Sequence, residues 1–195
     1  MLTRKWSITP AMIRFLSGDR LGYTLSPTYE YLNDPFEIYE GYVIPSGGHN
    51  FLYHTISIQS APRRQVWGKV DYRFGGFFNG TRNEISLKAG YKVVVPLFVG
   101  GELIRNDITL DEGGFIATVY RINLNILFSP DITLYNFVQY DSKSNKMGWQ
   151  SRFQWILRPG REIFLVWNSI ASDPYERFQL EEASAKVKIK FTIRF

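Results

Sequence analysis

The fold is decided most clearly by residues 185–195, which read Ala-Lys-Val-Lys-Ile-Lys-Phe-Thr-Ile-Arg-Phe. From Val187 onward every odd position is apolar, and every even position carries Lys, Thr or Arg. A period of two predicts a β-strand with one apolar face and one polar face. The stretch therefore indicates a sheet that presents a different environment on each side.

The same alternation recurs in residues 85–93, 120–128 and 149–157. Each run has about ten residues, which is longer than the usual ~5–6 residues of a strand in a globular protein. This length matches a tilted strand that crosses a membrane. We expect ten strands in all, near residues 21–32, 51–60, 66–77, 84–94, 97–106, 115–128, 132–140, 149–157, 161–171 and 185–195.

Residues 6–16 alternate less regularly and contain Pro10, so they predict either an eleventh, weaker strand or an entry arm. The expected organisation is an N-terminal arm or partial strand over residues 1–19 and a β-barrel over residues 20–195. Connections of two sizes are predicted to alternate. Short turns are expected at 61–64, 95–96, 129–131 and 158–161, and long loops at 33–50, 78–83, 107–114, 141–148 and 172–184.

Alternating short and long connections predict an antiparallel, up-and-down transmembrane β-barrel of about ten strands, or the C-terminal part of a larger one. Aromatic residues concentrate near the expected strand ends, as they do at the two interfaces of a membrane. One belt is expected on the long-loop side and one on the short-turn side. The first contains Tyr31, Tyr53, Phe77, Phe78, Phe115, Tyr140, Trp149 and Trp167, and the second Trp67, Phe98, Phe128, Tyr135, Trp155 and Phe195.

Composition excludes several classes of protein. No run approaches the ~18 apolar residues of a membrane-spanning helix, and there is no cysteine. The net charge is +5, but basic residues are spread over most strands and interleaved with acids, so nucleic-acid binding is not expected. The only histidines, His49 and His54, form no catalytic constellation. We expect no enzyme activity, no cofactor and no metal site, since Asp107, Asp111 and Glu112 lack a calcium-loop spacing.

The polar positions of the alternating strands are predicted to line the interior of the barrel, where charges are hydrated or paired. Such an interior either admits anionic or sugar-like solutes or is plugged by ion pairs. The candidate interior residues are Lys69, Asp71, Arg73, Lys88, Lys92, Glu102, Arg121, Asn123, Asn125, Arg152, Gln154, Lys186, Lys188 and Lys190.

Several short motifs carry a family resemblance that covers the chain from about Ser17 onward. They are Gly18-Asp19-Arg20-Leu21-Gly22, Pro35-Phe36-Glu37-Ile38, Gly75-Gly76-Phe77-Phe78-Asn79-Gly80, Val138-Gln139-Tyr140-Asp141 and Arg158-Pro159-Gly160-Arg161. In combination they resemble the C-terminal half of the DUF5916 family of bacterial proteins. In that family a carbohydrate-binding-like domain precedes an outer-membrane-type β-barrel. The terminal Phe195 resembles the signal that the barrel assembly machinery reads.

The resemblance implies a bacterial outer-membrane location, with membrane lipid and the barrel assembly machinery as partners and glycans as partners of a missing N-terminal domain. Because no signal peptide and no such domain are encoded here, we expect a fragment of a longer protein. The expected function is a non-enzymatic barrel region that anchors, or forms a polar channel for, a carbohydrate-related protein. The alternative is a soluble all-β carbohydrate-binding module, whose apolar faces would pair internally.

Overall fold

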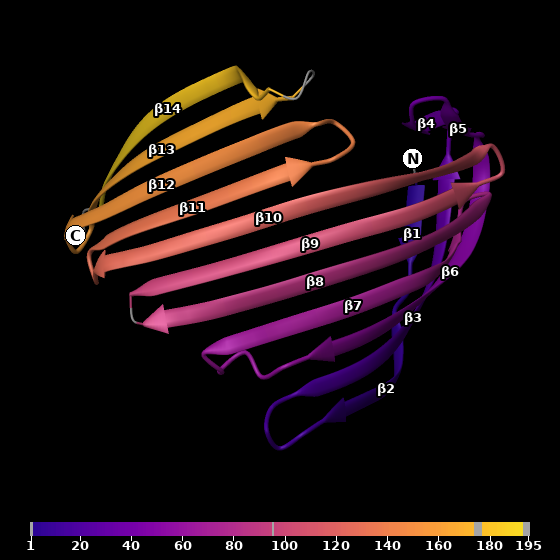
Figure 1. Cartoon of the computed structure of the whole chain (residues 1–195), viewed down its shortest axis with the longest axis horizontal. Coiled ribbons are helices and arrows are strands. Elements are labelled where there is room, and N and C mark those ends of the chain that lie inside the picture. Colours follow the sequence, from indigo (N-terminus) through magenta and orange to yellow (C-terminus); the bar gives the residue numbers. More distant parts are fainter. Residues whose placement is uncertain (1, 95, 174–176, 193–195) are drawn as a thin grey trace. The chain divides into compact units, whose positions relative to one another are not determined.

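The computed structural model describes residues 2–94, 96–173 and 177–192, and over these residues it contains strands and no helix (Figure 1). No helix of the described chain is therefore long and apolar enough to cross a membrane. The strands are β1 (Leu2–Lys5), β2 (Ile8–Arg14), β3 (Arg20–Leu32), β4 (Phe36–Tyr39), β5 (Tyr42–Ile44), β6 (Gly47–Gln59), β7 (Val66–Phe77), β8 (Gly80–Val94), β9 (Leu97–Leu110), β10 (Gly113–Ser129), β11 (Ile132–Asp141), β12 (Lys146–Arg158), β13 (Arg161–Ser172) and β14 (Gln179–Phe191).

The predicted all-β, up-and-down fold is confirmed. The sheet has the order β1-β3-β6-β7-β8-β9-β10-β11-β12-β13-β14, and the strand pairs with a described register are antiparallel. Sequential strands become neighbours because short hairpins join them. This order is an open path over the described residues, with β14 at one end and β1 and β2 both paired with β3 at the other.

Residues of the predicted arm pair with β3. In β1, Leu2 lies opposite Tyr31, and in β2, Arg14 lies opposite Arg20. The two strands occupy different lengths of β3, and the register slips between Ile8 and Ala11, on either side of Pro10. Proline has no N–H to donate to a ladder, which accounts for the interruption there.

Four of the five long loops predicted from the sequence are shorter in the structure. Those at 141–148 and 172–184 are shortened because β12 begins at Lys146 and β14 begins at Gln179, and those at 78–83 and 107–114 are tight turns. β7 ends at Phe77 and β8 begins at Gly80, and likewise β9 ends at Leu110 and β10 begins at Gly113. The strand ends next to the tight turns are rich in polar residues, a composition typical of loops, yet these residues belong to the strands. The turn at Phe78 is tight enough to require a positive φ of 51°. The first predicted long loop, 33–50, contains the short antiparallel hairpin β4–β5.

The chain divides into two compact units. Unit 1 comprises Met1–Leu87 and Ile104–Ala117, and unit 2 comprises Lys88–Leu103 and Thr118–Phe195. β8, β9 and β10 each contribute residues to both units.

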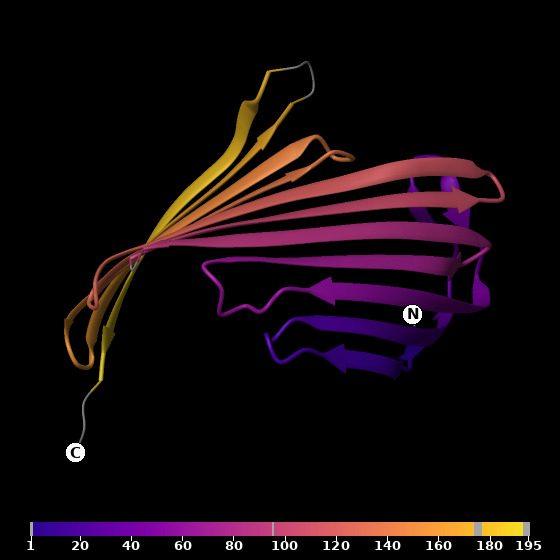
Figure 2. The same cartoon turned by 60° about the horizontal axis from the view of Figure 1, so that its bottom comes forward.

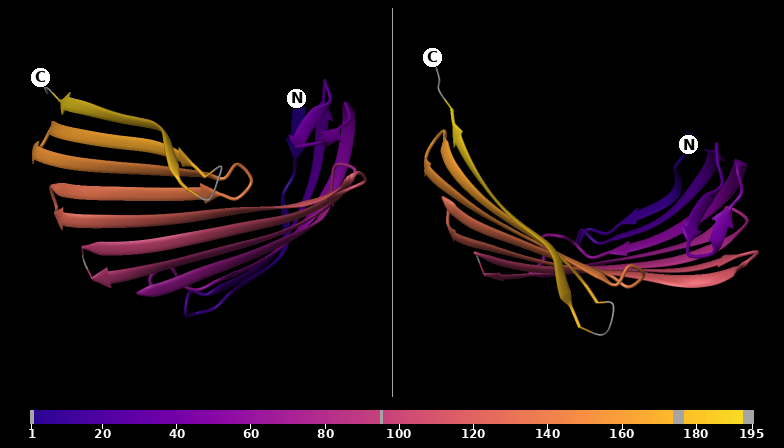
Figure 3. Two further views of the ribbon diagram at one scale, coloured as in Figure 1. Left: turned by 45° about the horizontal axis from the view of Figure 1, so that its top comes forward. Right: turned by 90° about the horizontal axis from the view of Figure 1, so that it is seen from above.

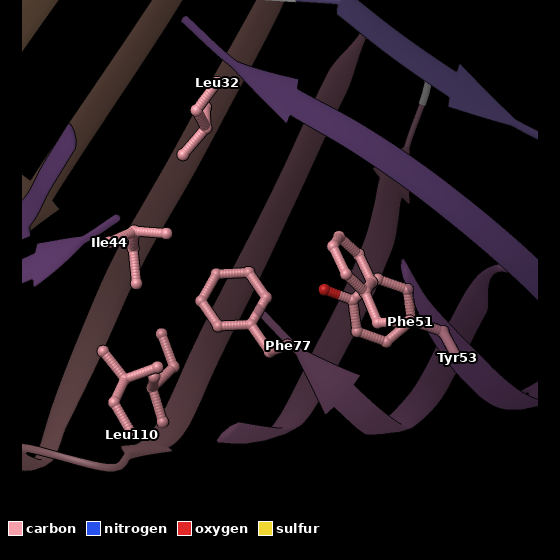
Figure 4. Close-up of a cluster of buried hydrophobic side chains, with 7 residues drawn as sticks. Leu32, Ile44, Phe51, Tyr53, Phe77 and Leu110 are labelled. Carbon is pink, nitrogen blue, oxygen red and sulfur yellow. The ribbon is translucent and has the colours of Figure 1, made fainter. Parts of the chain in front are cut away.

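Unit 1 contains a hydrophobic cluster, shown in Figure 4. The β4–β5 hairpin lies beside the ends of β3 and β6, from which it arises (Figure 3). The hairpin contributes Ile44 to this cluster, and Ile44 has no exposed surface. The buried members are Leu32, Ile44, Phe51, Tyr53, Phe77, Ile108 and Leu110.

Unit 2 contains the four consecutive neighbours β11 to β14, drawn in orange to yellow in Figure 2. Its registers are regular over most of each strand pair. Val138 faces Trp149, Phe153 faces Leu165, and Leu165 in turn faces Val187. Because directly opposed residues share a face of the sheet, these pairs define the side to which each residue belongs.

Candidate functional site

The polar face of unit 2 is defined by its strand registers. Arg121 lies opposite Gln139, and Asn125 lies opposite Tyr135, which lies opposite Arg152. Arg152 also lies opposite Val166 of β13, which in turn lies opposite Lys186 of β14. The structure thus brings together eight of the predicted interior residues on this face: Arg121, Asn123, Asn125, Arg152, Gln154, Lys186, Lys188 and Lys190.

The opposite face of unit 2, its apolar face, carries large side chains that are exposed. Ile122 is 57% exposed, Trp155 is 42% exposed and Ile189 is 57% exposed. Nothing within the described residues covers them to the extent expected of a core. The odd and even positions of the same strands therefore meet two different chemical environments.

Ion pairs connect two further predicted interior residues, Lys88 and Glu102, to the polar face of unit 2. Lys88 Nζ lies 2.9 Å from Glu102 Oε1, and Arg121 lies 3.1 Å from Glu102 Oε2. Arg121 Nε also donates to Gln139 Oε1 at 2.9 Å. Lys92 shares the even phase of Lys88 along β8, which by alternation places it on the same side.

The polar face of unit 1 contains Lys69, Asp71 and Arg73 on β7. Lys69 Nζ lies 2.6 Å from Asp71, which also accepts a hydrogen bond of 2.5 Å from Ser57. Arg73 lies 3.3 Å from Glu84, a residue that pairs with Arg82 as well. These cations and anions neutralise one another, so this face is a network of salt bridges.

Glu84 and Glu162 were not among the predicted interior residues, although both form ion pairs with cationic residues of the polar faces. Glu84 is nearly buried, with 11% of its side chain exposed. Glu162 accepts from Lys190 at 3.0 Å and from Gln154 at 3.2 Å. The alternation of the strand could have indicated Glu84, because Glu84 and Lys88 are both even-numbered residues of the same strand and so share a face. Glu84 was overlooked because it lies at the end of the predicted strand.

Two aromatics predicted for a membrane belt, Tyr53 and Phe77, are buried in the unit 1 cluster, and for them the prediction is wrong. Tyr53 lies opposite Gly75 and Ser26, in phase with Thr55 and therefore on the polar side of the strand. Phe78 and Phe115, also assigned to the belt, pack against the same cluster. Packing by the β4–β5 hairpin supplies the apolar environment that the phase alone did not reveal.

A turn at the start of β3 is fastened to the turn between β6 and β7. Asp19 Oδ1 accepts from the Ala61 amide at 2.8 Å, and Asp19 Oδ2 accepts from Arg64 at 2.8 Å. The hydroxyl of Ser17 donates to the same carboxylate at 2.7 Å. These hydrogen bonds, that of Ser17 first and then those of Ala61 and Arg64, hold the pKa of Asp19 below its usual value.

The two histidines contact aromatic side chains and the backbone. His54 Nδ1 lies 2.7 Å from the Tyr23 hydroxyl, and its ring stacks on Phe74 with centroids 5.1 Å apart. His49 Nε2 contacts the Pro45 carbonyl at 3.0 Å. In the described part of the chain no group of His, Asp or Glu side chains is suited to a metal ion. The predicted assembly residue, Phe195, lies outside the described residues.

Comparisons with known proteins add no relative: no family model, curated protein or solved structure matches this chain. The resemblance to the DUF5916 family stays a prediction. The features of the chain that bear on its function are therefore the polar face and the apolar face of the sheet.

Proposed function

We propose that the chain is the membrane-spanning region of a bacterial outer-membrane β-barrel, in which the polar faces of both units line the interior. The observation that carries the proposal is the segregation of side chains by face. Ion pairs such as Lys88–Glu102 lie on one side, while Ile122 and its neighbours are exposed on the other. Alternation of lipid-facing and interior residues is the pattern of outer-membrane strands.

The exposed apolar side chains need a non-aqueous environment. Leaving apolar surface in water costs about 25 cal/mol per Å², and soluble monomers rarely expose continuous apolar patches beyond a few hundred Å². The large apolar residues exposed on β10 to β14 include Ile122, Trp149, Leu165, Trp167 and Val187. Lipid supplies a medium in which this surface is stable, while backbone groups stay paired in the ladders.

In this role the region anchors, or forms a polar channel for, a carbohydrate-related protein, and it performs no chemistry of its own. The anchoring and carbohydrate parts rest on the motif resemblance. The channel part rests on the polar faces, whose Lys, Arg, Glu and amide side chains interact with water and with one another.

A pair of adjacent substitutions tests the orientation of the faces. Ile122→Arg places a charge on the apolar face, whereas Asn123→Arg places the same charge on the polar face of the same strand. An arginine near the bilayer midplane costs about 2–4 kcal/mol when it faces lipid. We therefore expect Ile122→Arg to reduce the yield of folded protein in phosphatidylcholine vesicles strongly, and Asn123→Arg to fold nearly as the parent does.

The readout is the difference in gel migration between unheated and boiled samples after refolding in detergent or vesicles. A chain that remains dissolved and folded without detergent would contradict the proposal. If that chain also bound glycans, the soluble carbohydrate-binding module would be the correct function. Equal folding of the two arginine variants in vesicles would show that lipid does not contact the face carrying Ile122.

A further inference from the structure

The polar face of unit 2 has a groove of about 480 Å³ over β11, β12 and β13. Its volume lies within the range of small-ligand sites, about 300–1,000 Å³. The lining side chains come from three neighbouring strands in register: Phe137 lies opposite Gln150, which lies opposite Asn168. Gln139, which lines the groove, links it through Arg121 to the ion pairs of Glu102.

A glycine forms the floor of this groove. Gly148 lies between Gln139 and Ile170 in the ladder, and a Cβ built on it would meet no atom within 4 Å. Its φ is not positive, so no backbone conformation requires glycine there. The missing side chain leaves space beside the polar groups of the adjoining strands.

Amide side chains supply the polar groups of the groove. Gln150 Nε2 donates to Asn168 Oδ1 at 2.8 Å, and Gln139 Oε1 accepts from Arg121. These contacts orient the amides and use the side-chain oxygens of Gln139 and Asn168 and one N–H of Gln150. An amide offers both donors and acceptors, which suits hydroxyl groups that both donate and accept.

An aromatic ring and balanced charge complete the site. Phe137 is 39% exposed, and the electron-rich face of such a ring attracts the weakly positive C–H groups of a sugar ring. At the end of the groove, Asp141 accepts from the amides of Lys143 and Ser144, and Lys146 pairs with Glu181 at 2.9 Å. The charged side chains are thus engaged, and the groove favours a neutral ligand.

We propose that this groove binds a neutral glycan, with Phe137 stacking on a sugar ring and Gln139, Gln150 and Asn168 hydrogen-bonding its hydroxyls. The inference deepens the proposed function, on which it rests, by naming the solute that the polar face recognises. The open space above Gly148 accommodates one or two sugar units.

The test uses the full chain refolded in lauryldimethylamine oxide, a detergent without a sugar headgroup. Maltose, cellobiose and chitobiose are the probes, tetra-alanine is the comparison ligand, and saturation-transfer NMR reports binding. Gly148→Leu fills the groove without backbone strain. Gly22→Leu is the matched control, since Gly22 is also a strand glycine whose added Cβ would make only an ordinary 4.0 Å contact with Ser57.

We expect at least one disaccharide to bind. Gly148→Leu and Phe137→Ala should each raise its Kd by about tenfold or more. Gly22→Leu should leave the Kd unchanged. Binding that is equal in Gly148→Leu and the parent, or tighter binding of tetra-alanine than of any sugar, would overturn the glycan site.

The gel-migration assay separates this inference from the proposed function. A chain that shows heat-dependent migration and inserts into vesicles, yet binds none of the three disaccharides, would refute the glycan groove alone. A chain that fails to insert would refute the membrane proposal, whatever it binds.

Discussion

The two units differ in how they hold their side chains. Every buried hydrophobic residue among the described residues, from Leu32 to Leu110, lies in unit 1. In unit 2 the large apolar residues are partly or fully exposed, and Leu165 is 45% exposed. Unit 1 has an internal core, whereas unit 2 has a sheet with two exposed faces. The stability of unit 2 must therefore depend more on its surroundings.

The β4–β5 hairpin explains the difference. Tyr39 stacks on Phe115 with centroids 4.6 Å apart, and the Tyr42 hydroxyl donates to the Gly114 carbonyl at 3.4 Å. These contacts hold the hairpin against the start of β10 and bring Ile44 into the cluster. In the described part of unit 2 no hairpin is inserted in this way.

The largest effect is expected from Ile44→Ala. Removing a fully buried isoleucine side chain leaves a cavity and typically costs about 2–5 kcal/mol. Leu165→Ala in unit 2, where the side chain is exposed, should lower the free energy of unfolding in detergent much less. Urea unfolding followed by Trp fluorescence measures both variants. Equal losses would show that the apparent core of unit 1 does not stabilise the protein more than the face of unit 2 does.

Ion pairing should not differ between the units. Glu84 in unit 1 and Glu102 in unit 2 each contact two cations with little exposed side chain, 11% and 16%. We expect Glu84→Gln and Glu102→Gln each to cost about 1.5–3 kcal/mol, the range for hydrogen bonds to charged groups.

Glu181→Gln provides the control, because Glu181 and its partner Lys146 are both well exposed and such pairs contribute little. Its free energy of unfolding should match that of the parent. A large loss for Glu84→Gln with none for Glu102→Gln would extend the difference between the units from apolar burial to electrostatics.

The smallest effect concerns the turn clamp of unit 1. Since the folded-state pKa of Asp19 is lowered, its stabilisation is fully present above the ordinary pKa of an Asp and is lost as the pH falls through the lower folded value. Asp19→Asn should therefore be slightly less stable than the parent at neutral pH, with the two converging in acid. Unfolding measured across that pH range checks this. A constant difference at all pH values would show that the carboxylate charge plays no part.

The sequence predicted the strands well because the two-residue period requires no long-range information. The ten predicted strands correspond to β3 and β6 to β14, with most starts at or before the predicted residue, while β6 ends one residue earlier than predicted and β14 ends at Phe191. The prediction of loops at residues 78–83 and 107–114 was wrong, because these residues are mostly polar and yet most of them belong to strands. The sequence also could not show that Phe137, Gln139 and Asn168 border one groove, because their proximity follows from the registers of three strands.

The sequence by itself determined the strand periodicity and which side chains share a face, since backbone geometry sends alternate residues to opposite sides. Only the tertiary structure decided that Ile44 is buried, that Glu84 joins two arginines and that Gly148 is the floor of a groove. These features depend on how one strand is registered against the next and on where an inserted hairpin packs. Neither is fixed by the period of a single strand.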